Sequence, residues 1–253
     1  NLCAKLIALL LARANRHLPP GAAALVEQQR INALRLLRAV LQNDRAATRV
    51  ALAATSPGSY SSANAARIPP HFPQLYVATL SGHADVVRQL LEAQADPNER
   101  TRSGALPLHA AIYKGELECA RILLDHGADV GGVTDKGYTA LHVACATGSL
   151  ACARLLVRHG AVVDAQAEEC DEPIHLASHQ GHAGCVQLLL DLGASRHVKT
   201  LRSALKSACE QGHFECARLI HGALSRRMAA SPRGGERKVE PRRHLSPVRH
   251  QTF

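Results

Sequence analysis

One short motif recurs at a fixed interval along this chain. It reads LPLHAA at residues 106–111, TALHVA at 139–144 and EPIHLA at 172–177, so that each copy begins 33 residues after the last. Self-similarity at one period of this length indicates stacked structural units, each of which buries its apolar side against its neighbours. Such stacks present an extended surface, and the repeat therefore favours binding over catalysis.

Three positions of the repeat predict a short helix that ends at a glycine. The glycines are Gly82, Gly115, Gly148, Gly181 and Gly212. An apolar residue lies seven positions before each glycine: Leu75, Leu108, Leu141, Ile174 and Leu205. An alanine lies four positions before it: Ala78, Ala111, Ala144, Ala177 and Ala208. This spacing places the apolar residue and the alanine on one helix face, and glycine supplies the left-handed turn that ends the helix.

A second helix follows each glycine. Its apolar runs are 86–91, 120–124, 153–157, 186–190 and 217–220. A Gly-Ala pair then closes three of the units, at residues 127–128, 160–161 and 193–194, whereas Gln94-Ala95 takes its place in the first. Each unit is therefore expected to be a helix pair followed by a turn.

These motifs resemble the ankyrin repeat, whose signature is T-P-L-H-x-A before two antiparallel helices and a β-turn finger. The resemblance covers about residues 71–224, and the first and last copies depart from the signature, at Pro73–Tyr76 and Ser203–Lys206. It implies an all-α solenoid of five repeats with β-turn fingers. Aromatic residues make up only 3% of the chain, which suits Ala/Leu helix pairs better than a compact enzyme core.

The N-terminal part predicts a degenerate capping repeat. Leu36, Ala39 and Asn43 reproduce the Leu, Ala and Gly spacing, and Asn tolerates the left-handed conformation. The extra residues before the next unit form a predicted loop at 56–64. Residues 6–12 are apolar but too short to span a membrane, and we favour an amphipathic helix over a signal peptide. The predicted division is an N-terminal helix and linker at 1–23, a capping repeat and loop at 24–70, the ankyrin domain at 71–224 and a disordered basic tail at 225–253.

The cysteines and histidines follow the repeat rather than a chemical site. Cysteine occurs four residues after four of the glycines, at Cys119, Cys152, Cys185 and Cys216, and three residues before two of them, at Cys145 and Cys209. Equivalent positions in neighbouring units are too far apart for disulfides or zinc, so buried thiols in a reducing compartment, the cytoplasm or nucleus, are expected. Cys170, in a predicted finger, is the candidate reactive thiol. His179 and His182 could share a cation, but no third ligand is evident.

We expect no cofactor, no metal and no catalytic centre. His109, His142 and His175 are one unit apart, and the family resemblance gives them a structural role, tying the finger turn to the start of the helix. The sequence contains neither a glycine-rich phosphate loop nor a Gly-x-Ser-x-Gly elbow. The acidic run at 168–172 reads as a solvated finger or as a contact for a basic patch on a partner.

The resemblance also implies a partner-binding face made of finger tips and the outer residues of the first helices. These residues vary between units while the scaffold residues do not. They are Arg102, Ser103, Tyr113, Lys114, Asp135, Lys136, Tyr138, Thr147, Glu168, Glu169, Asp171, His179, Gln180, Arg202, Glu210 and Gln211. Tyr113 and Tyr138 are the preferred anchors, because exposed Tyr is enriched at interfaces. Charge along the face changes from basic to acidic, which would orient a partner.

The tail at 225–253 carries eight Lys and Arg residues against two Glu, a net charge of +6 of the +9 of the chain. A solvated tail is the simplest interpretation. Alternatives are a nuclear-import patch, weak contact with nucleic acid or acidic lipid, or phosphorylation at the Ser-Pro pairs of Ser231 and Ser246.

Three functions remain open. The first, which we favour, is a monomeric, non-enzymatic adaptor that binds a protein partner. The second is the substrate-recognition subunit of a cullin-type ubiquitin ligase, because the recurrent Cys resembles that of ankyrin-repeat and SOCS-box proteins, although no Leu–Cys box follows Cys216. The third is an ankyrin array attached to an enzyme.

Overall fold

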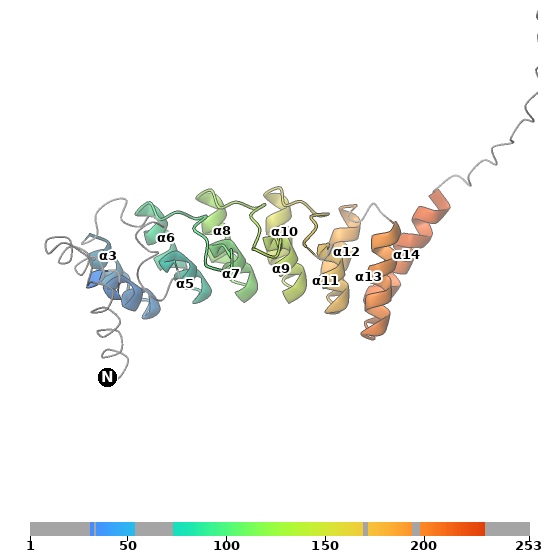
Figure 1. The fold of residues 1–253 in the computed structure, drawn as a ribbon, viewed down its shortest axis with the longest axis horizontal. Helices are drawn as coiled ribbons and strands as arrows, with labels where there is room; N and C mark the ends of the chain where they lie inside the picture. The colour runs from blue at the N-terminus through green and yellow to red at the C-terminus, as the bar shows by residue number, and fades with distance from the viewer. Residues whose placement is uncertain (1–30, 33, 54–72, 169–171, 194–197, 231–253) are drawn as a thin grey trace, which may run out of the picture.

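The computed structural model of the protein describes residues 31–32, 34–53, 73–168, 172–193 and 198–230. Pairs of antiparallel helices stand side by side along one axis and form an elongated stack (Figure 1). The part of the chain that the structure describes is all-α, with a single isolated β-bridge between Val133 and Thr139. In this same part, no helix is both long and apolar enough to cross a membrane. The predicted N-terminal helix and linker and the predicted loop at 56–64 lie outside the described residues.

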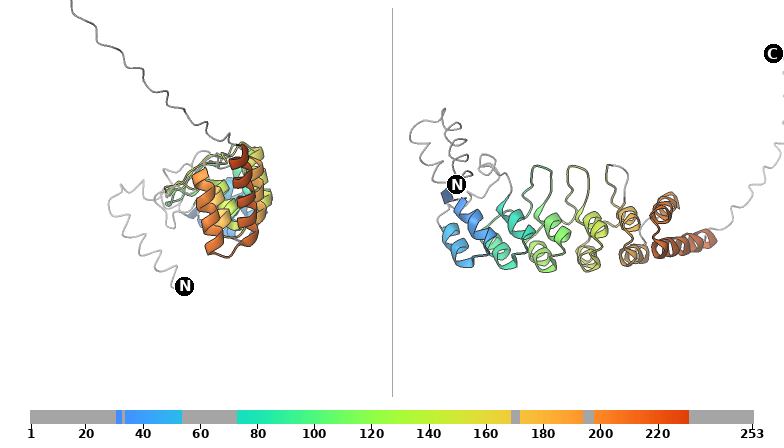
Figure 2. Two further views of the ribbon diagram at one scale, coloured as in Figure 1. Left: turned by 90° about the vertical axis from the view of Figure 1, so that its right-hand side faces the viewer. Right: turned by 90° about the horizontal axis from the view of Figure 1, so that it is seen from below.

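Five helix pairs make up the main stack. Their first helices are α5 (Gln74–Leu80), α7 (Pro107–Lys114), α9 (Ala140–Thr147), α11 (Pro173–His179) and α13 (Val198–Glu210). Their second helices are α6 (Ala84–Glu92), α8 (Leu117–Asp125), α10 (Leu150–Arg158), α12 (Ala183–Asp191) and α14 (Phe214–Ala230). The connections from α6 to α7 and from α8 to α9, and the described part of the connection from α10 to α11, rise from one side of the stack as fingers (Figure 2).

The helix ends form where the repeat predicts them. Gly82, Gly115, Gly148, Gly181 and Gly212 all have positive φ, between 72° and 79°. The N–H of the residue after the glycine then bonds back into the helix, as from Glu116 to the Ala111 carbonyl (2.9 Å). This left-handed step reverses the chain within two residues, which lets the second helix pack against the first.

A continuous apolar core runs the length of the stack. Each unit contributes its alanine position and the first four also their apolar position, so that Leu108, Ala111, Leu141 and Ala144 are at most 1% exposed. The alanines let neighbouring first helices approach closely, and these helices contact one another along the row from α5 to α13. Burial of each unit therefore depends on the next unit, as in other solenoids.

The degenerate N-terminal unit is present. Residues 34–41 are helical, and α3 (Arg45–Ala53) follows them and packs against α6. Leu36 and Ala39 are buried, and Asn43 takes the glycine position with a φ of 51°. Gln94 likewise replaces a glycine, with a φ of 67°. Asn and Gln thus adopt here the conformation that the repeat elsewhere gives to Gly.

The last unit differs from its prediction. α13 already begins at Val198, because no Gly or Pro interrupts residues 198–210. Leu205 is only half-buried, and Leu201 and Ala204 supply the buried contacts. Arg202, at the repeat position that Tyr138 occupies in a finger, therefore lies within a helix. α14 continues to Ala230, so the first six residues of the predicted disordered tail, 225–230, are helical, and the rest of the tail is outside the described residues.

Candidate protein-binding surface

Neighbouring fingers are hydrogen-bonded to each other at their tips. The Asp135 N–H donates to the Ser103 carbonyl, and one unit later the Glu168 N–H donates to the Lys136 carbonyl, both at 3.3 Å. Gly104 packs so closely against Asp135 that an added Cβ would collide with it. The tips thus form a continuous row in which each finger is positioned by the next.

Two finger turns are closed by a threonine, whereas Ala167 occupies the equivalent position in the next finger. The Thr101 N–H donates to the Ala105 carbonyl (2.9 Å), and the Thr101 hydroxyl oxygen accepts from the Ala105 N–H (3.0 Å). Thr134 makes the same two contacts with Tyr138, at 3.0 and 3.2 Å. These turn-closing bonds, with those between neighbouring fingers, restrain the finger backbone, and a restrained surface loses less entropy on binding.

The motif histidines connect the fingers to the helices. Nδ1 of His109, His142 and His175 accepts the backbone N–H three residues earlier, at the start of the helix, each at 3.1 Å. His109 also donates from Nε2 to the Tyr138 carbonyl of the next finger (3.1 Å). Burial lowers the pKa of His109 and so favours the neutral ring that this pattern requires. The predicted structural role is thus seen directly at His109.

A second set of histidines joins successive helix pairs. His182, at the start of α12, lies with Nε2 3.2 Å from the Ala146 carbonyl. His213, just before α14, lies with Nε2 3.0 Å from the His179 carbonyl. His182 is thus used in a link between units, and the cation site suggested for His179 and His182 does not form. Within the described residues, no three His, Cys, Asp or Glu side chains group closely enough to hold a metal ion.

The sequence of these helix pairs matches a known protein family. The family described as ankyrin repeats (3 copies) matches residues 75–167 and 163–225, more than half of the chain. The chain belongs to the ankyrin-repeat family. No curated protein matches it at a significant level.

Ankyrin repeats are protein–protein interaction modules and are generally non-enzymatic, so the described stack is a protein-binding domain. In this ankyrin domain most of the predicted face is exposed. The exposed residues are Arg102, Ser103, Tyr113, Lys114, Asp135, Lys136, Thr147, Glu168, His179, Gln180, Arg202, Glu210 and Gln211. Glu169 and Asp171 lie outside the described residues, as do Cys170, Ser231 and Ser246.

The two preferred anchor tyrosines differ. Tyr113, on α7, is 63% exposed. Tyr138 is only half-buried rather than free, because its backbone closes a finger turn and its ring meets the edge of His142, with centroids 5.6 Å apart and an interplanar angle of 70°. The expected exposure is therefore found for Tyr113 but not for Tyr138, which contacts His109 of the preceding repeat and His142 of its own.

The acidic run is not a uniformly solvated finger. Glu168 is exposed, but Glu172 is 2% exposed and immediately precedes α11. Its Oε1 accepts a hydrogen bond from the Thr200 hydroxyl of α13 (3.1 Å). Glu172 thus connects two repeats, and only the part of the run before it is a candidate for partner contact.

The cysteines pack as small core side chains, with one exception. Cys119, Cys145, Cys152, Cys185 and Cys216 are buried, whereas Cys209 is exposed, contrary to the prediction. A thiol hydrogen bond joins Cys145 of α9 to Cys185 of α12, and this contact and burial raise the pKa of Cys145. Cys209 occupies the same repeat position as Cys145, but the described residues contain no following helix pair to cover it.

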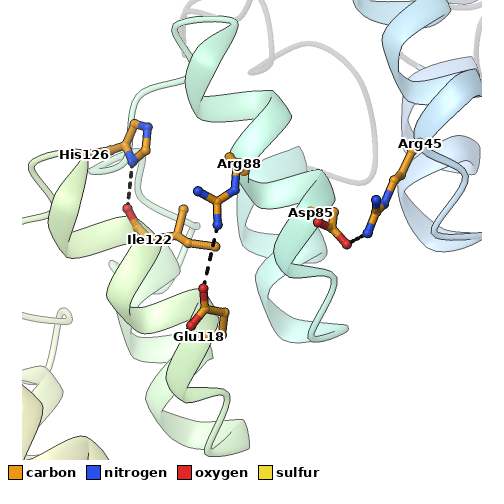
Figure 3. A network of polar contacts seen from close by, with 6 residues as sticks. All are labelled: Arg45, Asp85, Arg88, Glu118, Ile122 and His126. Atoms are coloured by element: carbon orange, nitrogen blue, oxygen red, sulfur yellow. Dashed lines mark hydrogen bonds and ion pairs between the residues drawn. The ribbon is translucent and has the colours of Figure 1, made fainter.

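An ion-pair network on the second helices was not predicted. Arg45 of α3 pairs with Asp85 of α6, and Arg88 of α6 lies 3.7 Å from Glu118 of α8 (Figure 3). His126, which follows α8, lies with Nδ1 2.8 Å from the Ile122 carbonyl (Figure 3). The sequence carries a partial signal for this network, because an acidic residue lies three positions after both Gly82 and Gly115, at Asp85 and Glu118.

Proposed function

We propose that this ankyrin protein is a non-enzymatic adaptor that binds a protein partner across its finger tips and first helices. The observation that supports it most is the hydrogen-bonded row of fingers, which holds Ser103, Asp135, Lys136 and Glu168 at fixed relative positions. A preformed surface loses little conformational entropy when it binds. Tyr113 supplies an exposed aromatic side chain beside this row.

The charges along the row favour a partner with an opposite order of charge. Arg102, Lys114 and Lys136 are exposed in the second and third repeats, and Glu168 follows on the next finger. A partner whose acidic residues face these three basic side chains and whose basic residue faces Glu168 would bind in a single orientation. We therefore propose that these four side chains orient the partner and that Tyr113 anchors it.

The buried thiols also favour a reducing environment. Five cysteines at repeat positions serve as core side chains, a use that suits a protein of the cytoplasm or nucleus. We propose this location, and we propose that the protein acts as a monomer.

The test is affinity purification from cells with residues 1–253 as bait, with partners identified by mass spectrometry. Tyr113→Ala is compared with Phe214→Ala, because Phe214 is 83% exposed but lies at the start of a second helix. We expect a partner that is lost with Tyr113→Ala and kept with Phe214→Ala.

If neither substitution changes the set of proteins recovered, the partner binds away from this face and the proposal is overturned. Recovery of cullin-type ligase subunits with both variants and the wild type would instead support the ligase-receptor alternative.

A further inference from the structure

The second helices carry one charged column that runs across the repeats. Arginine occupies the same repeat position in four of the five units, as Arg88, Arg121, Arg154 and Arg218, with Gln187 in the fourth. Three residues before each of these lies a second column: Asp85, Glu118, Ala151, Gly184 and Glu215. The basic column is thus almost complete, whereas the acidic column is missing in the third and fourth units.

Where the acidic residue is present, it pairs with an arginine. Glu118 lies 3.7 Å from Arg88 of the preceding repeat, and Glu215 pairs with Arg218 of its own helix, with Arg218 Nε 3.0 Å from Glu215 Oε2. Arg45 of the capping unit, four residues before the equivalent column position, pairs with Asp85 (Figure 3). Both ends of the column are therefore neutralised.

In the middle of the column the same register offers no carboxylate. Arg88 faces Glu118 at the acidic position of the following repeat. At that position, the repeat after Arg121 has Ala151 and the repeat after Arg154 has Gly184. Both arginines are exposed, and neither makes an ion pair within the described residues. α10 has no acidic residue at all and adds the exposed Arg158. We call Arg121, Arg154 and Arg158 the outer basic strip.

We infer that the outer basic strip binds an acidic segment of a protein partner, whose carboxylates take the places left by Ala151 and Gly184. Neighbouring packed helices lie about 8–10 Å apart, so Arg121 and Arg154 call for two carboxylates about 10 Å apart. Glutamates seven residues apart on a helix meet this spacing, at about 10.5 Å. This surface is separate from the finger face, and the inference does not depend on the proposed function.

The surrounding charges favour a short acidic segment over other anions. Asp125 on α8 and Asp191 on α12 are exposed at the repeat position that Arg158 occupies on α10. They flank the strip and would repel the continuous phosphate backbone of a nucleic acid. The chain's own tail is no occupant, because its net charge is +6. A partner with a few well-spaced carboxylates fits between the two aspartates.

The first experiment titrates the 15N-labelled full chain with an alanine-rich peptide of about 18 residues, long enough to be helical, that carries two glutamates seven residues apart. The salt concentration is kept at about 20 mM, since exposed pairs are screened at higher ionic strength. We expect saturable shifts of amide resonances in α8 and α10, which are absent with the corresponding glutamine peptide. Arg121→Ala/Arg154→Ala should raise the Kd roughly fivefold or more.

The matched control is Arg88→Ala/Arg218→Ala, which removes the same charge from arginines that already have partners. It should leave the Kd within about twofold of the wild type. An equal loss in both double variants would show only a general charge effect and overturn the inference. Tighter binding of a single-stranded oligonucleotide, lost in the same Arg121/Arg154 variant, would also overturn it in favour of phosphate.

A second pair of substitutions restores the missing carboxylates within the chain. Ala151 and Gly184 are exposed, and a Cβ on Gly184 would meet only Leu150 at an ordinary 3.4 Å, so Ala151→Glu/Gly184→Glu introduces no clash at Cβ. We expect this variant to keep or raise its Tm and to lose the peptide-induced shifts. Retention of peptide binding by a folded Ala151→Glu/Gly184→Glu variant would contradict the inference.

Discussion

The imidazole of His182 lies across the end of the first helix of the preceding repeat, with Nε2 3.2 Å from the carbonyl oxygen of Ala146. The ring occupies the space beside Gly148, where an added Cβ would collide with it. His213 has the same relation to the His179 carbonyl and to Gly181. The glycine that ends a helix therefore also admits a side chain that links two repeats.

The two tasks of this glycine can be separated by substitution. Gly115 and Gly148 have nearly equal φ values, 74° and 72°, but a Cβ at Gly115 would meet nothing within 4 Å. Gly115→Ala should therefore cost only the left-handed backbone strain, about 1–2 kcal/mol. Gly148→Ala should cost about 1 kcal/mol or more beyond that, because the histidine must move. Urea denaturation of both variants measures the difference.

The same comparison in a His182→Ala background gives the control. Removal of the ring should bring the cost of Gly148→Ala close to that of Gly115→Ala. If the two glycine substitutions are equally destabilising with His182 intact, the ring does not depend on Gly148.

Tyr113 and Tyr138 should separate binding from stability. Tyr113 is 63% exposed, so Tyr113→Ala should change the free energy of unfolding by no more than about 0.5 kcal/mol. Tyr138→Ala removes the edge contact with His142 and should destabilise the fold by about 1 kcal/mol. Thermal unfolding followed by circular dichroism measures both, and equal effects of the two substitutions would contradict the difference in their surroundings.

The repeated part of the fold could be predicted because the residues that determine the helices and turns of each unit lie within that unit. Glycine at the helix end, alanine four residues before it and the apolar residue seven before it are all local features, and Asn43 extended them into a degenerate unit. A left-handed turn needs only the residue that adopts it, so the sequence was sufficient to place it.

The errors concern positions whose surroundings come from other repeats. The Tyr138 carbonyl accepts a hydrogen bond from His109 of the preceding repeat, and Cys209 is exposed because no further helix pair covers it within the described residues. Glu172 was predicted to lie in a solvated finger, because its hydrogen bond to Thr200 of the next repeat cannot be inferred from the local sequence. Arg202 lies in α13 rather than in a finger for a different reason: the last unit lacks the hexapeptide, and no Gly or Pro prevents α13 from starting at Val198. Contacts between units must be known before such side chains can be assigned to a surface or to the core.

Glu99 should make the protein less stable as pH rises. Burial, and then the charge of Asp96, raise the pKa of Glu99 from 4.5 to about 7. The contribution of a raised carboxyl pKa is complete below the unfolded value of 4.5 and is lost as pH rises through the folded value of about 7. Glu99→Gln should therefore raise the Tm at pH 8, with a smaller gain at pH 6 and none near pH 4.5.

The pH series is compared with the wild type at each pH, because His109 acts in the opposite direction. Burial lowers the pKa of His109 below 6.5, so its contribution is complete above that value and is lost as pH falls through the folded pKa. The effect of His109 on stability is the same in the wild type and in Glu99→Gln, so it cancels in the difference between their Tm values. Glu92→Gln, at an exposed carboxylate of α6, is the control. A gain from Glu99→Gln that does not vary with pH would exclude titration of Glu99 as its cause.

Cys209 should be the first of the described cysteines to react with iodoacetamide. Cys209 is exposed, whereas Cys119 and Cys216 are 1% exposed, and burial raises the pKa of the Cys119 thiol to about 11. Because the thiolate is the reactive form, both burial and the raised pKa slow alkylation. The experiment uses a Cys3→Ser/Cys170→Ser background, so that only cysteines of the described helices remain.

Peptide mapping after brief alkylation should find Cys209 modified and the buried cysteines unmodified, and guanidinium should make all of them reactive. A Cys209→Ser variant should then take up almost no label while folded. Labelling of Cys216 at the rate of Cys209 would instead mean that α14 separates from α12 in solution, since Cys216 is reached only when the last repeat opens.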